Sequence, residues 1–153
     1  MPGFKPRGHP PHGRPYWLGA EEVLLITFCT LPRRLPQLNC DEAWGGLIKA
    51  TLHHEAMGNW RPLLVVAMPD HVHVMAHAPS GRKLESLIGS LKRTVTMRKA
   101  IRWQRGFFDH RPRNDQARAR CREYVRMNPV RAGLVARSED WPFIWHKGPR
   151  AWA

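Results

Sequence analysis

Two histidines separated by one residue are the first feature of this chain that could do chemistry. His71 and His73 follow a Pro-Asp break between two apolar runs, a pattern that predicts a strand over residues 63–68, a tight turn and a second strand over residues 71–76. Because side chains alternate faces along a strand, both imidazoles are expected on one face, about 6.6 Å apart by rise. There they could share one divalent ion, although a half-exposed sheet surface also carries such pairs.

A second chemical signal lies at Tyr124 and Asn128. The two residues are four apart in a segment with a helical pattern, so a phenol and an amide project from the same face, about 5–6 Å apart. Mg²⁺ accepts carbonyl oxygens and imidazoles alongside water and phosphate. Two histidines and Asn128 would leave positions open for a phosphate, with Tyr124 as the nucleophile. The alternative is that Tyr124 is a packed aromatic and Asn128 an ordinary helix-end residue.

The charge of the chain indicates a polyanionic partner. Its 25 Lys and Arg against 12 Asp and Glu give a net charge of +13, and the pI is about 11.0. Residues 92–131 hold 13 basic and three acidic residues, a net charge of +10. This segment also carries Trp103, Phe107 and Phe108, which can stack on bases, so nucleic acid is favoured over a generic solvated surface. The basic residues predicted to contact DNA are Lys92, Arg93, Arg98, Lys99, Arg105, Arg111, Arg113, Arg118, Arg120, Arg122 and Arg126.

Composition excludes other classes of protein. A chain of 153 residues is long enough for one domain with a core. It has no apolar run of about 18 residues and no apolar stretch of the secretory kind near its start. Its three cysteines have no metal-type spacing, which favours reduced thiols. We therefore expect a cytoplasmic, nucleoid-associated protein with no membrane partner.

Hydrophobic periodicity predicts the elements that position these residues. Residues 23–29 form a continuous β-rich run, predicted to be a buried strand. A helix is expected from a cap at Asn39 or Asp41 to about residue 57. A second helix is expected from a cap at Ser80 to about residue 100. The predicted buried stripe of the first is Trp44, Leu47, Ile48 and Leu52, and that of the second is Leu84, Leu87, Ile88, Leu91 and Val95.

The remaining elements lie within the basic segment or after it. Residues 101–114 are expected to be a loop or irregular strand, and a third helix is predicted from a cap at Asn114 or Asp115 to near Asn128. Leu134 and its neighbour Val135 could form a last strand. The order β-α-β-β-α-(loop)-α-β predicts an α+β fold with a ferredoxin-like antiparallel sheet, in which the third helix packs near the face that bears the histidines.

Four blocks of this sequence, in order, resemble one known family. They are residues 68–73 (MPDHVH), 103–110 (WQRGFFDH), 124–135 (YVRMNPVRAGLV) and 140–143 (DWPF). The family is that of the REP-associated tyrosine transposases, within the single-tyrosine HUH transposases, also called IS200-like. The resemblance covers roughly residues 20–146. It implies a transposase domain over residues 21–146. The Pro, Gly, His and basic residues near the start predict a flexible tail over residues 1–20, and residues 147–153 are expected to form a second tail.

The resemblance also implies a specific activity. Members of the family cleave single-stranded DNA beside hairpins formed by repetitive extragenic palindromes, and the tyrosine becomes joined to the 5′ phosphate. By matching position, Tyr124 is implied as the nucleophile and His71 and His73 as ligands of Mg²⁺ or Mn²⁺. Asn128 stands where related transposases use Gln, so the third ligand is one methylene shorter. His110 and His77 are the candidates for a general base. The chain is expected to act as a monomer or a homodimer.

Two other functions are open at this point. One is a non-catalytic, RRM-like module that binds single-stranded nucleic acid by charge and stacking, or an inactive domesticated transposase. Such a module has no need of His71, His73 and Tyr124 together. The other is a metallohydrolase of small phosphoesters, which the basic segment disfavours because a small substrate needs no long cationic track. A relaxase or replication initiator is disfavoured because those proteins usually carry additional domains.

Overall fold

The computed structural model describes residues 23–148 of the chain. The predicted tail over residues 1–20, and residues 149–153 of the second predicted tail, lie outside the described residues. None of the helices in the described part is long and apolar enough to cross a membrane. The elements are β1 (Val23–Leu31), α1 (Asp41–Ala56), β2 (Arg61–Ala67), β3 (His71–His77), α2 (Arg82–Arg98), β4 (Arg102–Trp103), β5 (Phe108–His110), α3 (Asp115–Arg126), α4 (Asn128–Arg131), the 3-10 helix η1 (Ser138–Asp140) and β6 (Ile144–His146).

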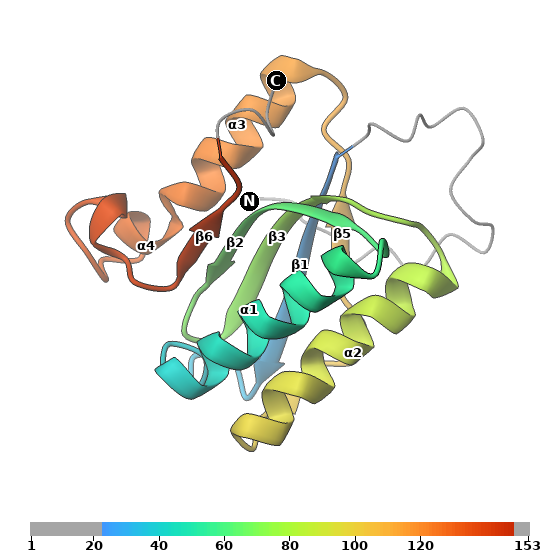
Figure 1. Cartoon of the computed structure of the whole chain (residues 1–153). Helices are drawn as coiled ribbons and strands as arrows, with labels where there is room; N and C mark the ends of the chain where they lie inside the picture. Colours follow the sequence, from blue (N-terminus) through green and yellow to red (C-terminus); the bar gives the residue numbers. More distant parts are fainter. Residues whose placement is uncertain (1–22, 149–153) are drawn as a thin grey trace.

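An antiparallel sheet organises the described residues. Its strand order is β4-β1-β3-β2-β6, and β5 also pairs with β1. Strand β3 lies between β1 and β2, so α1 crosses over it to join two parallel strands. Helices α1 and α2 cover one face of the sheet, while α3 and α4 lie beside β6 and β2 (Figure 1). This is the α+β, ferredoxin-like arrangement predicted from the order of the elements.

Each face of the sheet has its own apolar cluster. Alternate residues of the strands, such as Phe28, Val72 and Val74, pack against α1 and α2. The residues between them, such as Leu25 and Met75, belong to a second cluster with α3 and the segment after it. Alternation along the strands therefore separates two environments, and the second is the one that faces α3.

The prediction for α1 was partly wrong. The cap is Cys40, which makes no side-chain capping bond, instead of Asn39 or Asp41. Leu52 is 38% exposed, and the buried positions are Ala43, Gly46, Leu47, Ala50 and Thr51. The reason is a close approach between α1 and α2: a Cβ built on Gly46 would lie 3.4 Å from the Val95 Cα atom. Gly46 therefore lies against α2. Of the predicted stripe, Leu47 is buried, Trp44 and Ile48 are partly buried against the core, and Leu52 is exposed.

The prediction for α2 was right in its packing and wrong in its start. All five residues of the predicted stripe are buried, including Leu91 at 0% exposed. The helix begins after Gly81, whose φ is 63°, and not after a Ser80 cap. Glycine adopts this backbone conformation without the steric cost of a Cβ atom, so Gly81 makes the turn into the helix.

The third helix begins as predicted, and the last strand lies elsewhere. The Asn114 Oδ1 atom accepts a hydrogen bond of 2.8 Å from the Ala117 N–H. The predicted strand at Leu134 and Val135 is wrong, because these residues lie in a turn after Gly133 and Leu134 is 42% exposed. The last strand is β6, which pairs with β2. Strand β6 occupies the edge of the sheet beside β2, and within residues 23–148 residues 134–135 pair with no strand.

Candidate active site

The two histidines project together from β3, as the alternation of the strand predicted. His73 lies opposite Thr27 of β1, and His71 lies opposite Cys29. The centroids of the two imidazole rings are 4.8 Å apart, and the ring planes are nearly perpendicular at 83°. This separation is shorter than the rise between the residues because the two side chains lean toward one another. Two imidazoles in this arrangement can present ring nitrogens to one point.

His71 is oriented by the residue before it. Its Nδ1 atom lies 2.7 Å from the Asp70 Oδ1 atom, so the proton is held on Nδ1 and the lone pair lies on Nε2. This hydrogen bond, together with those from Arg33 and the Arg34 backbone N–H, lowers the pKa of Asp70 well below its ordinary value of 3.8. A carboxylate behind an imidazole is the usual way in which a protein fixes the tautomer of a metal-binding histidine.

His73 is held by Thr27 on the adjacent strand. The His73 Nδ1 atom and the Thr27 Oγ1 atom are 2.8 Å apart, and both residues are 8% exposed. Burial, followed by the charge of His71, lowers the pKa of His73 well below its ordinary value of 6.5. The imidazole is therefore neutral near pH 7, which is the form that binds a metal ion.

Tyr124 and Asn128 reach the histidines from the other side of the cavity. Tyr124 lies on α3 and Asn128 begins α4, so one helix ends and the next begins between them, at Met127. The Asn128 Nδ2 atom is 3.4 Å from the His71 Nε2 atom. The Arg131 guanidinium carbon lies 3.9 Å from the centroid of the Tyr124 ring. Helix α3 is fixed in this position because Cys121 and Val125 are buried against the second face of the sheet.

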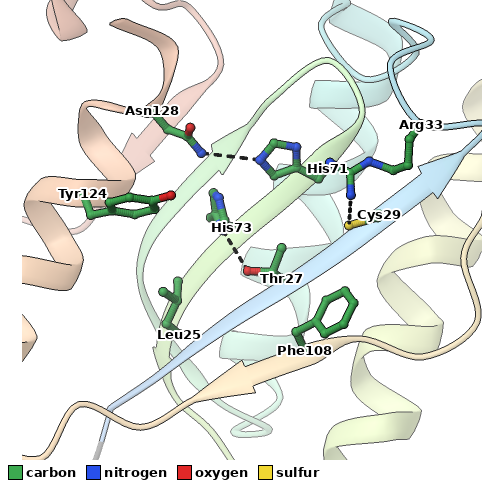
Figure 2. A pocket seen from close by; sticks show the side chains of 9 residues that line it. All are labelled: Leu25, Thr27, Cys29, Arg33, His71, His73, Phe108, Tyr124 and Asn128. Carbon is green, nitrogen blue, oxygen red and sulfur yellow. Dashed lines mark hydrogen bonds between the residues drawn. The ribbon is translucent and has the colours of Figure 1, made fainter. Parts of the chain in front are cut away.

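These four side chains line one cavity of about 400 Å³ (Figure 2). Figure 2 shows the Tyr124 hydroxyl and both imidazoles directed toward the same space, with Asn128 above them. The tertiary structure thus brings together the predicted nucleophile and the three predicted metal ligands, from two distant parts of the chain. The lining residues are Leu25, Thr27, Cys29, Arg33, His71, His73, Phe108, Tyr124 and Asn128.

Sequence reasoning missed three polar residues of this cavity. Thr27 and Cys29 belong to a strand whose continuous apolar run predicts only core, although the pairing of β1 with β3 places them opposite the histidines. Arg33 lies in the loop after β1, outside the basic segment of residues 92–131. The position of Thr27 two residues before Cys29 was a signal for one shared face. No sequence signal links Arg33 to Asp70 and His71, because the contact between Arg33 and Asp70 depends on which strands pair.

The predicted general bases lie outside the cavity. His77 ends β3 and His110 ends β5, and neither is among the residues that line it. Within residues 23–148 no group of three or more His, Cys, Asp and Glu side chains is placed to hold a metal ion. A metal ion in this cavity would therefore need Asn128, water or substrate beside the two histidines.

The predicted DNA-binding residues are divided between different parts of the fold. Lys92, Arg93 and Arg98 lie on α2, and the Lys92 ammonium donates to the backbone oxygens of Gln104 and Gly106. A second group lies on α3, the helix that carries Tyr124 and that lies beside β6 and β2 (Figure 1). They are Arg118, Arg120, Arg122 and Arg126. Lys99 caps α2, and Arg105, Arg111 and Arg113 lie in the segments that flank β5.

The comparisons with known proteins give a consistent result. No family model matches the chain. A protein of Haemophilus influenzae, named a putative REP-associated tyrosine transposase, is 28% identical over 105 residues, which is 57% of this chain and 60% of the relative. The REP-associated tyrosine transposase of Escherichia coli K12 is 31% identical over 81 residues, 51% of this chain and 49% of the relative. The chain thus spans about half of the length of these curated relatives.

A solved structure extends the likeness to the fold. It is described as a REP-associated tyrosine transposase bound to a REP hairpin. Its TM-score is 0.66 and its sequence identity 26%, over 86% of this chain and 79% of that one. The sheet, its helices and the sequence similarity together identify the chain as a relative of transposases. The particular proteins that it resembles are REP-associated tyrosine transposases, which confirms the resemblance found in the sequence motifs.

Proposed function

We propose that this protein is a metal-dependent endonuclease and strand transferase that acts on single-stranded DNA at palindromic hairpins. The observation that carries this proposal is the meeting of Tyr124 with His71, His73 and Asn128 in one cavity of about 400 Å³. A nucleic-acid-binding module does not require a phenol beside paired imidazoles. The relatives named as transposases support the same reaction class.

The cavity fits a divalent ion of the Mg²⁺ or Mn²⁺ kind. The His71 Nε2 lone pair faces the cavity because Nδ1 is engaged by Asp70, and His73 is buried and neutral. The Asn128 amide lies 3.4 Å from His71 Nε2, and a half-turn of that amide presents its oxygen instead of its nitrogen. A bound ion would withdraw charge from the non-bridging oxygens of a phosphodiester and so lower the barrier to its displacement.

The proposed reaction transfers a phosphodiester from DNA to the protein. The Tyr124 Oη atom attacks the phosphorus, a bond forms between Oη and phosphorus, and the bond from phosphorus to the 3′ oxygen breaks. The phenol proton passes to solvent, and the departing 3′ oxygen takes a proton from water. The products are a 5′-phosphotyrosine and a free 3′ hydroxyl. The reverse attack by a 3′ hydroxyl rejoins DNA without ATP, because the phosphodiester energy is kept in the covalent bond.

The substrate class follows from charge and from the relatives. The net charge of +13 favours a polyanion, and the solved relative is described as bound to a REP hairpin. Helix α3 carries its arginines on the same element as Tyr124, so a strand bound along α3 would pass the nucleophile. We infer that a hairpin with a single-stranded flank is the substrate.

The test is the formation of a covalent adduct. Purified protein is mixed with single-stranded hairpin oligonucleotides copied from palindromic repeats beside the gene, with Mg²⁺, Mn²⁺ or EDTA, and run on a denaturing gel. The expected result is a metal-dependent protein–DNA adduct that Tyr124→Phe abolishes, with a loss of about 10³-fold or more, as for removal of a covalent nucleophile. His71→Ala is expected to abolish the response to metal.

The outcomes separate the alternatives. An adduct that persists in Tyr124→Phe would contradict the assignment of the nucleophile. If a panel of repeat hairpins gives no adduct but binds tightly and in a salt-sensitive way, the protein is a binding module or an inactive transposase. Thermal unfolding of Tyr124→Phe controls for misfolding, and it should match the wild type because the ring that packs beneath Arg131 is retained.

A further inference from the structure

Arg33 lines the cavity and lies in the loop after β1, and the reaction proposed above gives it no role. It follows β1 directly, and its side chain lines the same cavity as His71, Tyr124 and Asn128. The side chain is 47% exposed, so it is accessible to a ligand while it is anchored at one end. Figure 2 shows it on the opposite side of His71 from Asn128.

Asp70 holds Arg33 and His71 at the same time. The Arg33 Nε atom donates to the Asp70 Oδ2 atom at 2.8 Å, while Oδ1 engages His71 Nδ1 at 2.7 Å. The backbone N–H of Arg34 donates to the same Oδ2 atom at 2.9 Å. One carboxylate with only 12% of its side chain exposed therefore fixes the position of a guanidinium relative to a metal-binding imidazole.

The backbone reinforces this arrangement. The N–H groups of Gln37 and Leu38 both donate to the Pro69 oxygen, at 2.8 and 3.0 Å, and the Thr30 N–H donates to the Asp70 oxygen at 2.9 Å. The loop that carries Arg33 is thus joined to the turn that carries Asp70 on both sides of the arginine. A guanidinium positioned in this way loses less conformational entropy when it binds a ligand than a free surface arginine does.

The guanidinium keeps donors for an anion. Its Nε atom is used by Asp70, and one Nη1 hydrogen points to the Cys29 Sγ atom at 3.3 Å. Among the described residues, the Nη2 amino group has no hydrogen-bond partner. An arginine whose far edge is free and whose near edge is fixed by a carboxylate can direct its remaining donors at a phosphate oxygen.

We propose that Arg33 binds a non-bridging oxygen of the scissile phosphate, with Asp70 as the residue that positions it. This inference rests on the proposed function and adds to it the group that holds the substrate phosphate opposite Tyr124. Arg33 supplies fixed positive charge and donors where negative charge develops during the attack. Its role would explain why one carboxylate is shared between a guanidinium and an imidazole: both must face the same phosphate.

The test compares two neighbouring arginines on two substrates. Arg33→Ala removes the guanidinium, and Arg34→Ala removes the same charge one residue away, while its backbone N–H still bonds Asp70. Each is assayed for adduct formation on the hairpin oligonucleotide and on the two diastereomers of a methylphosphonate at the scissile position, which lack one charged oxygen. Thermal unfolding is measured for both variants.

The expected result is specific to a phosphate contact. Arg33→Ala should slow adduct formation on the phosphodiester by about 100-fold, whereas Arg34→Ala should change it by less than about threefold, as for an exposed residue. On one methylphosphonate diastereomer the effect of Arg33→Ala should largely disappear, since the contact is already absent. If the wild type does not cleave the methylphosphonates, the same cycle is measured as binding affinity in the Tyr124→Phe background.

Other results overturn the inference in distinguishable ways. If Arg33→Ala lowers the rate equally on every substrate, the arginine only supports Asp70, and the proposal for Arg33 is wrong while the proposed function stands. The same conclusion follows if Arg33→Ala and Arg34→Ala behave alike. If the wild type forms no adduct on any repeat hairpin, the proposed function fails and the inference fails with it.

Discussion

The two faces of the central sheet are built from the same strands and serve different purposes. On the face covered by α1 and α2, residues such as Phe28, Val72 and Val74 are fully buried among apolar side chains. On the other face, the alternate positions Thr27, His71 and His73 line a polar cavity under α3. Neighbouring residues of one strand thus enter an apolar core and a candidate active site.

The comparison shows how a small domain can hold a polar site without losing its core. The helix-covered face excludes water over the length of the sheet and contributes most of the apolar burial. The cavity face has a smaller apolar cluster than the other face. It includes Cys121, Val125 and Trp141, and it fixes α3 beside the cavity. The polar groups of that face are hydrogen-bonded in pairs, so their burial is compensated. Stability and chemistry are therefore expected to respond to different substitutions.

The largest effect on stability is expected on the helix-covered face. Leu91 is 0% exposed in the core beneath α2, so Leu91→Ala should lower the free energy of unfolding by about 2–5 kcal/mol. Urea unfolding measures it. Leu52→Ala, at 38% exposed on α1, is the matched control and should cost less than about 1 kcal/mol. Both variants should form the adduct at the wild-type rate per folded molecule. A lower rate per folded molecule in Leu91→Ala would show that the core face and the cavity face are coupled.

A smaller effect is expected from acid on the cavity face. His73 has a pKa lowered by burial and then by the charge of His71, and Asp70 has one lowered first by its hydrogen bond with His71. Because both folded-state values are depressed, the unfolded chain takes up protons first. Stability should be fully present at neutral pH, fall as the pH drops below 6.5, and fall further below 3.8.

The contribution of Asp70 can be isolated by substitution. Asp70→Asn removes the carboxylate, so urea unfolding at pH 5 and pH 3 should show a smaller loss of stability over this interval than the wild type shows. The loss that remains belongs to other carboxyl groups. An equal loss in both proteins would mean that the contacts of Asp70 with His71 and Arg33 do not stabilise the fold.

The smallest effect is expected at two adjacent glycines of α1. A Cβ on Gly45 meets nothing within 4 Å, whereas one on Gly46 meets the Val95 Cα at 3.4 Å and the Arg98 Cγ at 3.3 Å. Gly45→Ala should raise the free energy of unfolding by about 0.5–1 kcal/mol through helix propensity. Gly46→Ala should raise the free energy of unfolding by less, or lower it, because the added Cβ atom meets the Val95 Cα atom, which belongs to the backbone of α2 and cannot move aside easily. Equal gains, measured by urea unfolding, would mean that the contact between α1 and α2 is looser than described.

Periodicity predicted the elements whose burial depends on local geometry. The stripe of α2, the strands of the hairpin and the shared face of His71 and His73 were all correct, because side-chain direction follows directly from helix and strand geometry. The Asn114 cap was also correct, since its partner lies three residues away. The stripe of α1 was partly wrong: Leu52 is exposed, whereas Gly46 lies against α2 at close range, and amphipathic patterns do not reveal that distance.

The sequence by itself determined which residues are candidates for chemistry: an imidazole pair, a tyrosine, an amide four residues later, and a strongly basic chain. Only the tertiary structure decided that Tyr124 faces the histidines and that Arg33 shares Asp70 with His71. It also placed the last strand against β2. The physical reason is one of range: alternation and capping are set within a few residues, whereas the cavity is made by hydrogen bonds and packing between segments 37 to 57 residues apart.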